Sequence, residues 1–228
     1  LYTLKTIDKE SKKASVNLWL HNANGNGMTQ LTRSSEGVGN PVLAVNLPGA
    51  DNQAMYLKGG QIWTIPLDGG ESAQVTKFDF GIDTFKVFRG PENKVFVACT
   101  INVYPDMSPS ETLAADKVKE EDGSGMVFDQ LLVRHWDTWN CYEKRSHVFV
   151  APLNIGSSGL FDLPKDDPQH QLVDLMAGLH TDCPGKPFGG TEDYDVHPEG
   201  SEIVIACRAF EEDGKQKRDM AWSTDCLL

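Results

Sequence analysis

The stretch Asn17-Leu-Trp-Leu-His-Asn-Ala-Asn-Gly-Asn-Gly-Met-Thr-Gln-Leu-Thr32 decides the fold, because it returns as Gln61-Ile-Trp-Thr-Ile-Pro-Leu-Asp-Gly-Gly-Glu-Ser-Ala-Gln-Val-Thr76. A Trp, a Gly, a Gln and a Thr recur at the same offset of 44 positions. A repeat of about 40 to 50 residues made of short strands is typical of a β-propeller, in which each small sheet buries its faces against its neighbours. The repeat therefore predicts an all-β chain built from four-stranded antiparallel blades.

Strand signals separated by turn residues divide the chain into four repeats. Their predicted bounds are roughly 1–34, 35–80, 81–178 and 179–228. The second repeat is a complete, uninterrupted blade, with strands expected at 42–47, 53–57, 61–67 and 72–78. The first repeat holds only the later strands of a blade, and the fourth stops where its third strand is expected to begin. The chain therefore amounts to about three and a half blades of a partial β-propeller, in one domain.

A Pro-Glu turn recurs in the third and fourth repeats. Gly90-Pro-Glu-Asn93 and His197-Pro-Glu-Gly200 lie at an offset of 107, and a β-rich stretch follows each of them. Pro favours the second position of a type I turn and Asn or Gly its end, so both segments predict the hairpin between the first two strands of a blade. In the third repeat, Phe149 is expected to take the place of Trp63 in the third strand.

Two insertions interrupt the period, at 105–126 and at 155–169. The first contains Ser108-Pro-Ser-Glu111, a capping box with Pro at the first helical position, and it predicts a short surface helix that runs on to Glu121. The second is rich in Gly, Ser, Pro and Asp, and it predicts an exposed loop between strands.

Composition and charge exclude several classes of function. The 228 residues are 39% hydrophobic and 24% charged, as in an ordinary globular protein, and no apolar run approaches the ~20 residues that span a bilayer. The formal net charge of −12 opposes binding to nucleic acid and to anionic membranes. Five cysteines at irregular spacings favour free thiols in a reducing compartment, which predicts a cytoplasmic location. The chain begins with Leu rather than Met, so its sequence leaves open a signal peptide upstream.

Several strings point to a known family. They are Phe128-Asp-Gln-Leu-Leu-Val-Arg-His-Trp-Asp-Thr-Trp139, Arg145-Ser-His-Val-Phe-Val-Ala-Pro-Leu153, Gly189-Gly-Thr-Glu-Asp-Tyr194 with His197-Pro-Glu-Gly200, and Asp219-Met-Ala-Trp-Ser-Thr224. Over nearly its whole length the chain resembles the propeller of prolyl oligopeptidase-family serine peptidases, particularly the acylaminoacyl-peptidase and dipeptidyl-peptidase-5-like branch. The Arg-His-Trp-Asp-x-Trp string is fairly specific for this branch, whereas the Trp-to-Thr repeat is shared with TolB-like propellers.

The resemblance implies a gating role. In that family a seven- or eight-bladed propeller covers an α/β-hydrolase domain of the same protein and screens the peptides that reach its serine. This chain holds only part of such a propeller. It contains no Gly-x-Ser-x-Gly nucleophile elbow, and Gly156-Ser-Ser-Gly159 has the wrong spacing. No catalytic residue is therefore assigned, the hydrolase domain is absent from the chain, and the isolated chain is expected to hydrolyse no peptide.

Three residues are candidates for substrate binding. His135 and Asp137 are two positions apart, so in a strand they share a face and could orient a substrate group. The alternative is structural: Trp136 and Trp139 pack in the core or between blades, and Arg134 pairs with Asp137 to fix the strand ends. Glu192 lies in an acidic cluster with Asp193 and Asp195, and the resemblance implies that such a carboxylate holds the α-ammonium group of a peptide. The alternative here is a solvated loop acid.

No metal or other cofactor is predicted. A zinc site would need ligands at a standard spacing, which is not offered by His180, Asp182 and Cys183 with Cys207 or His197. Two other functions remain open. One is a TolB-like propeller that serves as a protein-binding scaffold, and the other is a small enzyme with a pair of catalytic carboxylates. The open strand edges of an incomplete propeller also predict self-association of the chain.

Overall fold

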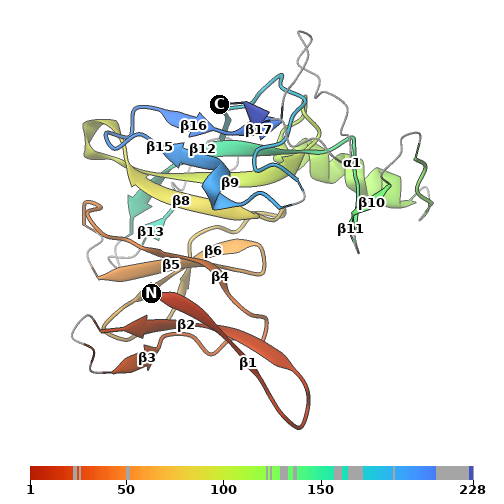
Figure 1. Cartoon of the computed structure of the whole chain (residues 1–228). Coiled ribbons are helices and arrows are strands. Elements are labelled where there is room, and N and C mark those ends of the chain that lie inside the picture. Colours follow the sequence, from red (N-terminus) through yellow and green to blue (C-terminus); the bar gives the residue numbers. More distant parts are fainter. Residues whose placement is uncertain are drawn as a thin grey trace.

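The computed structural model is mostly β-sheet (Figure 1). It describes residues 1–22, 25, 27–49, 52–121, 123, 125–128, 133–135, 138–156, 161–163, 172–186, 188–208 and 226–227. In this part of the chain the strands form several antiparallel sheets, as the all-β prediction required, and one α-helix accompanies them. That helix has 13 residues and is too short and too polar to cross a membrane.

The first two sheets are meanders in which each strand pairs with the next along the chain. The N-terminal sheet contains β1 (Tyr2–Ile7), β2 (Ala14–His21) and β3 (Met28–Gln30). The second sheet is four-stranded, as predicted for the complete repeat, and contains β4 (Gly39–Leu43), β5 (Gln53–Lys58), β6 (Gln61–Pro66) and β7 (Ala73–Gln74).

The third sheet has the same strand order, with the helical insertion between its second and third strands. It contains β8 (Thr84–Arg89), β9 (Val95–Val103) and β12 (Arg145–Ile155), and β12 also pairs with β13 (Phe161–Asp162) and β14 (Val173–Asp174). The remaining strands form three short pairs: β15 (Tyr194–Val196) with β16 (Ile203–Ile205), β17 (Cys207–Arg208) with β18 (Cys226–Leu227), and β10 (Arg134–His135) with β11 (Thr138–Trp139).

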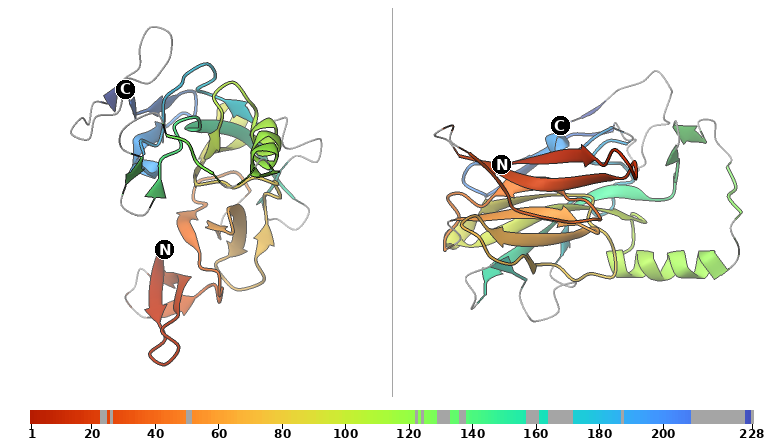
Figure 2. Two further views of the ribbon diagram at one scale, coloured as in Figure 1. Left: turned by 90° about the vertical axis from the view of Figure 1, so that its right-hand side faces the viewer. Right: turned by 90° about the horizontal axis from the view of Figure 1, so that it is seen from below.

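Successive sheets are stacked face to face, in the order of the chain (Figures 1 and 2). Apolar clusters of the described residues lie where they meet. Leu18, Tyr56 and Ile65 join the first sheet to the second, and a larger cluster that includes Met55 and Phe149 joins the second to the third. A further cluster joins the third sheet to the β15–β17 region, with Ala98, Val148, Met176, Cys183, Tyr194 and Cys207 as its buried members. The third sheet is thus buried on both faces, and the core is distributed between layers.

The sequence repeat is a repeated hydrogen-bond motif. The Thr32 hydroxyl accepts from the Leu18 N–H at 2.9 Å and donates to Asn17 Oδ1 at 3.1 Å, which in turn accepts from the Ser34 N–H at 2.7 Å. Forty-four residues later the same pattern is formed: Thr76 accepts from the Ile62 N–H and donates to Gln61 Oε1, both at 2.8 Å, and Gln61 Oε1 accepts from the Phe78 N–H at 3.0 Å. The recurring Thr is therefore held by the same local geometry in both sheets.

The strand register repeats as well. Trp19 faces Gln30 and Trp63 faces Gln74 across the last two strands of their sheets. Phe149 faces Asp174 in the same way, which agrees with the expectation that Phe149 takes the place of Trp63.

Removing the repeated hydroxyl should measurably destabilise the chain. Thr76 is buried, and Thr76→Val leaves the Ile62 N–H and Gln61 Oε1 without their partner, so we expect the free energy of unfolding to fall by about 2 kcal/mol. Thr32→Val should have a similar effect. Urea denaturation followed by circular dichroism measures both, with Thr29→Val on the exposed surface of β3 as the control. A Thr76→Val chain as stable as the control would contradict a structural role for the motif.

The two Pro-Glu segments do form the predicted hairpins, but their turns differ. At the second, the Gly200 N–H donates to the His197 carbonyl at 2.7 Å, with Pro198 at the second position of the turn. At the first, the Lys94 N–H donates to the Pro91 carbonyl, and the central residues Glu92 and Asn93 have φ of 56° and 61°. The prediction of a type I turn is wrong there, because the turn begins one residue later than expected.

The helical insertion is confirmed. Helix α1 (Pro109–Glu121) begins at the predicted capping box, in which the Glu111 N–H donates to Ser108 Oγ at 3.2 Å and the Ser108 N–H donates to Glu111 Oε2 at 2.8 Å. Together with β10 and β11 it extends beyond the stacked sheets at one end (Figure 2, right). In the second insertion, Phe161 and Leu163 are buried in the core, which differs from the expected exposed loop. Residues 157–160 and 164–171 of this region lie outside the described residues.

Candidate functional site

The first strands of three successive repeats lie side by side. The Asn40 side chain in β4 forms two hydrogen bonds with the backbone of Phe85 in β8: Nδ2 donates to the carbonyl at 3.0 Å, and the Phe85 N–H donates to Oδ1 at 3.1 Å. On the other side of β8, the Thr84 hydroxyl forms a hydrogen bond of 3.1 Å with the hydroxyl of Tyr194 in β15. These contacts hold β4, β8 and β15 against one another although they are far apart in the sequence.

A groove with a volume of about 630 Å³ lies against β8 and β15 and beside the segment that follows β4. Its walls come from the segment after β4, from the second half of β8 and from the turn after β15. The residues that form it are Val45, Asn46, Leu47, Lys86, Val87, Phe88, Arg89, Asp195, Val196, His197 and Pro198. Binding sites for small ligands and peptides are commonly concave and of this size, and they carry a few polar groups that fix the orientation of the ligand. The groove is therefore our candidate functional site.

A charged contact organises one wall of the groove. Lys86 Nζ donates to the Tyr194 carbonyl at 2.6 Å and to Asp195 Oδ1 at 2.9 Å, and it lies 5.2 Å from the centroid of the Tyr194 ring. The Lys86 ammonium, together with the Val196 N–H, holds the pKa of Asp195 below its usual range. Burial raises the pKa of Tyr194, so its hydroxyl keeps its proton and its hydrogen bond to Thr84.

Strand β8 also offers backbone groups to the groove. It is an edge strand of its sheet, and in such a strand every second residue directs its N–H and C=O away from the neighbouring strand. The backbone groups of Phe85 point away from β9, because Asn40 binds both of them. Val87 lies two residues further on, so its N–H and C=O point the same way. An extended peptide could pair with them as an added strand.

The structure places the predicted substrate-binding residues only in part. Glu192 is exposed in the 3-10 helix η2 (Thr191–Asp193), directly before β15, but it is not one of the groove residues. His135 lies in β10, and its side chain and all of Asp137 lie outside the described residues. Whether His135 and Asp137 share a face therefore stays a prediction.

The core interpretation of Trp139 is wrong. This side chain is 53% exposed, stacks on Phe128 with ring centroids 5.7 Å apart, and carries the Arg134 guanidinium 5.5 Å from its centroid. Trp136 lies outside the described residues. The described ends of the Arg-His-Trp-Asp-x-Trp string, Arg134–His135 and Thr138–Trp139, thus pair with each other as β10 and β11, away from the stacked sheets.

The side chains considered for zinc have separate partners. His180 lies 3.5 Å from Asp106, Asp182 accepts from Arg145 at 3.0 Å, and the Cys183 thiol donates to the Asp193 carbonyl at 3.4 Å. Among the described residues, no group of three His, Cys, Asp or Glu side chains is arranged to bind a metal ion.

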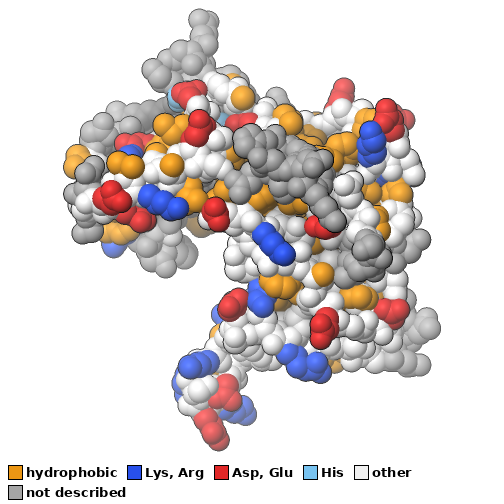
Figure 3. Space-filling model, turned by 180° about the vertical axis from the view of Figure 1, so that it is seen from behind, with side chains coloured by type: hydrophobic (Ala, Val, Ile, Leu, Met, Phe, Trp, Pro, Cys, Tyr) orange, Lys and Arg blue, Asp and Glu red, His pale blue; other side chains and the backbone are white. Residues whose placement is uncertain are grey.

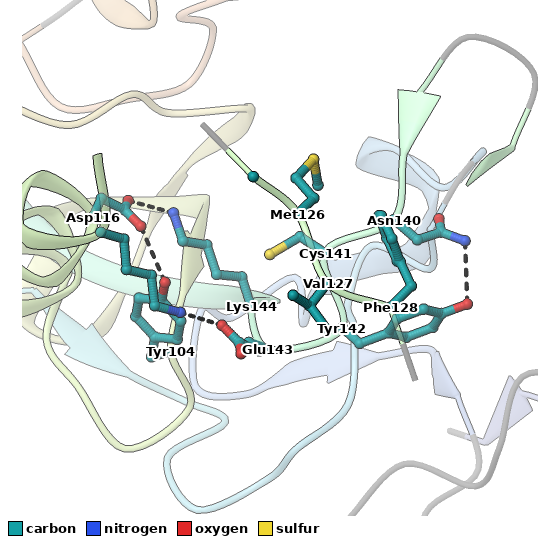
Figure 4. A pocket seen from close by; sticks show the side chains of 12 residues that line it. Tyr104, Asp116, Met126, Val127, Phe128, Asn140, Cys141, Tyr142, Glu143 and Lys144 are labelled. Carbon is teal, nitrogen blue, oxygen red and sulfur yellow. Dashed lines mark hydrogen bonds and ion pairs between the residues drawn. The ribbon is translucent and has the colours of Figure 1, made fainter. Parts of the chain in front are cut away.

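A second cavity, of about 540 Å³, lies between α1 and residues 140–144 (Figure 4). Its charged side chains satisfy one another: Lys144 pairs with Asp116, Lys119 pairs with Glu143, and the Tyr104 hydroxyl donates to Asp116 at 3.2 Å. These contacts fasten the helical insertion to the sheet. The described charged side chains that line this cavity are thus paired with one another, so it is the weaker candidate.

The key residues of the groove were not singled out from the sequence. The sequence places Asp195 in an acidic cluster, whereas the structure pairs it with Lys86, which lies 109 residues earlier. The available signal was positional, because Lys86 and Asp195 both belong to first strands of their predicted repeats. On the face of the molecule seen in Figure 3, Lys and Arg side chains are interspersed with Asp and Glu and do not gather into one basic patch.

Comparisons with known proteins place the chain near a group of peptidases, although no family model matches it. It is 26% identical over 208 residues to dipeptidyl-peptidase 5 of Porphyromonas endodontalis, a match that covers 91% of this chain and 27% of that protein. The chain is similar to dipeptidyl-peptidases. It is also 27% identical to dipeptidyl-peptidase 5 of Porphyromonas gingivalis over 232 residues, covering 98% of this chain and 29% of that protein.

A fungal relative gives a shorter match. The chain is 31% identical over 107 residues to a probable dipeptidyl-peptidase 5 of Aspergillus niger, covering 45% of this chain and 14% of that protein. The chain thus spans less than a third of the length of the relatives that it matches. These similarities indicate that the chain is related to peptidases.

Proposed function

We propose that the chain forms part of a β-propeller that selects peptide substrates for a serine peptidase of the dipeptidyl-peptidase type. The proposal is supported by the stacking of sheets in chain order, by the contact between their first strands, and above all by the groove against β8, β15 and the segment after β4. In a propeller the first strands line the central channel, so a groove on these strands faces the route that a substrate takes.

Selection in this proposal acts through size and backbone hydrogen bonds. The groove accommodates a short extended segment, which pairs with Val87 and lies against Phe88 and Val45, the latter 62% exposed. A folded domain cannot present such a segment. Glu192 would hold the α-ammonium of the peptide, and His135 with Asp137 would orient it. Hydrolysis through an acyl-enzyme would take place in an α/β-hydrolase domain of the same protein.

Hydrogen exchange measured by mass spectrometry on the 228-residue chain tests this function. An unstructured peptide of about eight residues is expected to slow exchange at the amides of β8 and of residues 195–197, without being cleaved. A small folded protein of similar composition should give no protection. The proposal is contradicted if the peptide protects no amide of the groove. Protection by the folded protein alone would instead favour a protein-binding scaffold.

A further inference from the structure

We propose that Arg89 makes the groove a binding site for a peptide carboxylate, so that peptides with an acidic side chain or a free C-terminus are preferred. This inference rests on the proposed function, because it concerns the same groove, and it adds the chemical class of peptide that the groove selects.

The first argument is the balance of charge inside the groove. Lys86 and Asp195 form an ion pair of 2.9 Å and neutralise each other. The His197 ring accepts the Glu199 N–H on Nδ1 at 3.2 Å, so that nitrogen carries no proton. Arg89 is exposed and lines the groove, and within the described part of the chain its guanidinium has no ion pair or hydrogen bond. One unneutralised cation therefore faces the groove.

The nearest acidic residue along the chain does not change this balance. Glu92, in the turn that follows β8, pairs with Lys94 at 2.6 Å. The positive sign of the groove is also opposite to that of the whole chain, whose formal charge is −12. An anionic peptide is repelled by most of the molecule and attracted by Arg89. Arg89 therefore determines where the peptide binds as well as how tightly it binds.

The second argument is geometry. Arg89 is the last residue of β8 and lies two positions beyond Val87, so both side chains project from the same face of the strand. The turn at Gly200 lies against the Arg89 carbonyl, so backbone pairing ends there, and a peptide residue bound at the Val87 backbone lies next to the Arg89 side chain. The planar guanidinium binds a carboxylate through two parallel hydrogen bonds. An amide has a similar shape but no negative charge, so it binds the guanidinium more weakly.

Three peptides of one parent sequence separate the two sources of the carboxylate. The first carries Glu at its central position and a C-terminal amide, the second carries Gln and a free C-terminal carboxylate, and the third carries Gln and the amide. Dissociation constants come from chemical-shift titrations of the 228-residue chain. We expect at least one of the two acidic peptides to bind about tenfold more tightly than the neutral one.

Variants assign this preference to Arg89. Arg89→Gln should reduce the tenfold preference to less than about twofold, Arg89→Lys should retain part of it, and the surface control Lys94→Gln should leave it unchanged. Circular dichroism verifies that each variant is folded. Equal binding of all three peptides to the parent chain, or a preference that survives Arg89→Gln, overturns the carboxylate site while leaving the proposed function intact. Failure of all three peptides to bind overturns both.

Discussion

The His147→Ala variant is expected to lose about 3 to 5 kcal/mol of its free energy of unfolding. His147 is 0% exposed, near the start of β12, and its Nδ1 lies 2.9 Å from Asp174 Oδ2. Its Nε2 lies 2.9 Å from the Leu179 carbonyl. Both ring nitrogens face acceptors, so the ring ties β12 to β14 and to the loop that follows. Alanine removes the ring from Asp174 Oδ2 and from the Leu179 carbonyl and opens a cavity between them.

Urea denaturation followed by tryptophan fluorescence measures this loss. The matched control is His21→Ala, because His21 is exposed at the end of β2 and its replacement should change the free energy of unfolding by less than about 0.5 kcal/mol. If His147→Ala and His21→Ala are equally stable, the buried contact does not hold β14 and the loop in place.

The Gly200→Ala substitution is expected to lower the free energy of unfolding by about 3 kcal/mol. Gly200 has a φ of +68°, a conformation that costs an L-residue about 1 to 2 kcal/mol. A Cβ atom there would also lie 2.6 Å from the Cα of Gly90 and would overlap the Arg89 carbonyl, which adds an overpacking cost of about 1 to 3 kcal/mol. The turn after β15 is thus pressed against the end of β8, and the substitution separates two neighbouring repeats.

The Gly178→Ala substitution measures the cost of the positive φ separately from the cost of steric overlap. Gly178 has a similar φ of +79°, but a Cβ atom there meets nothing within 4 Å. Its replacement should cost only about 1 to 2 kcal/mol in the same thermal and urea unfolding experiments. Equal losses for the two variants would mean that β8 and the turn at Gly200 are not in contact, and the groove would then lose one of its walls.

The local features of this fold could be predicted from the sequence. The Trp-to-Thr repeat marks a hydrogen-bond motif contained within one sheet, and the capping box of α1 lies within four residues. Phe149 could be matched to Trp63 because the strand register repeats. In each case the residues that interact are close in the sequence or follow the period of the repeat.

The candidate site could not be predicted in the same way. Asn40 binds Phe85 and Lys86 binds Asp195 only because separate sheets approach one another, and no periodicity within a strand reports that approach. The prediction that Trp139 is buried failed because a large apolar side chain favours burial, whereas strands β10 and β11 project away from the sheets. The exposure of a side chain in an insertion depends on where the insertion leaves the core.

Paramagnetic relaxation enhancement tests the central claim, which is that the first strands of successive repeats lie side by side around one groove. A nitroxide label at Val45→Cys, in a chain with Cys141→Ser and Cys226→Ser, sits on the exposed wall that follows β4. The account predicts strong broadening of the amide signals of Lys86 to Arg89 and of Asp195 to His197, and little change in α1. Broadening confined to β4 and its own sheet would contradict the account.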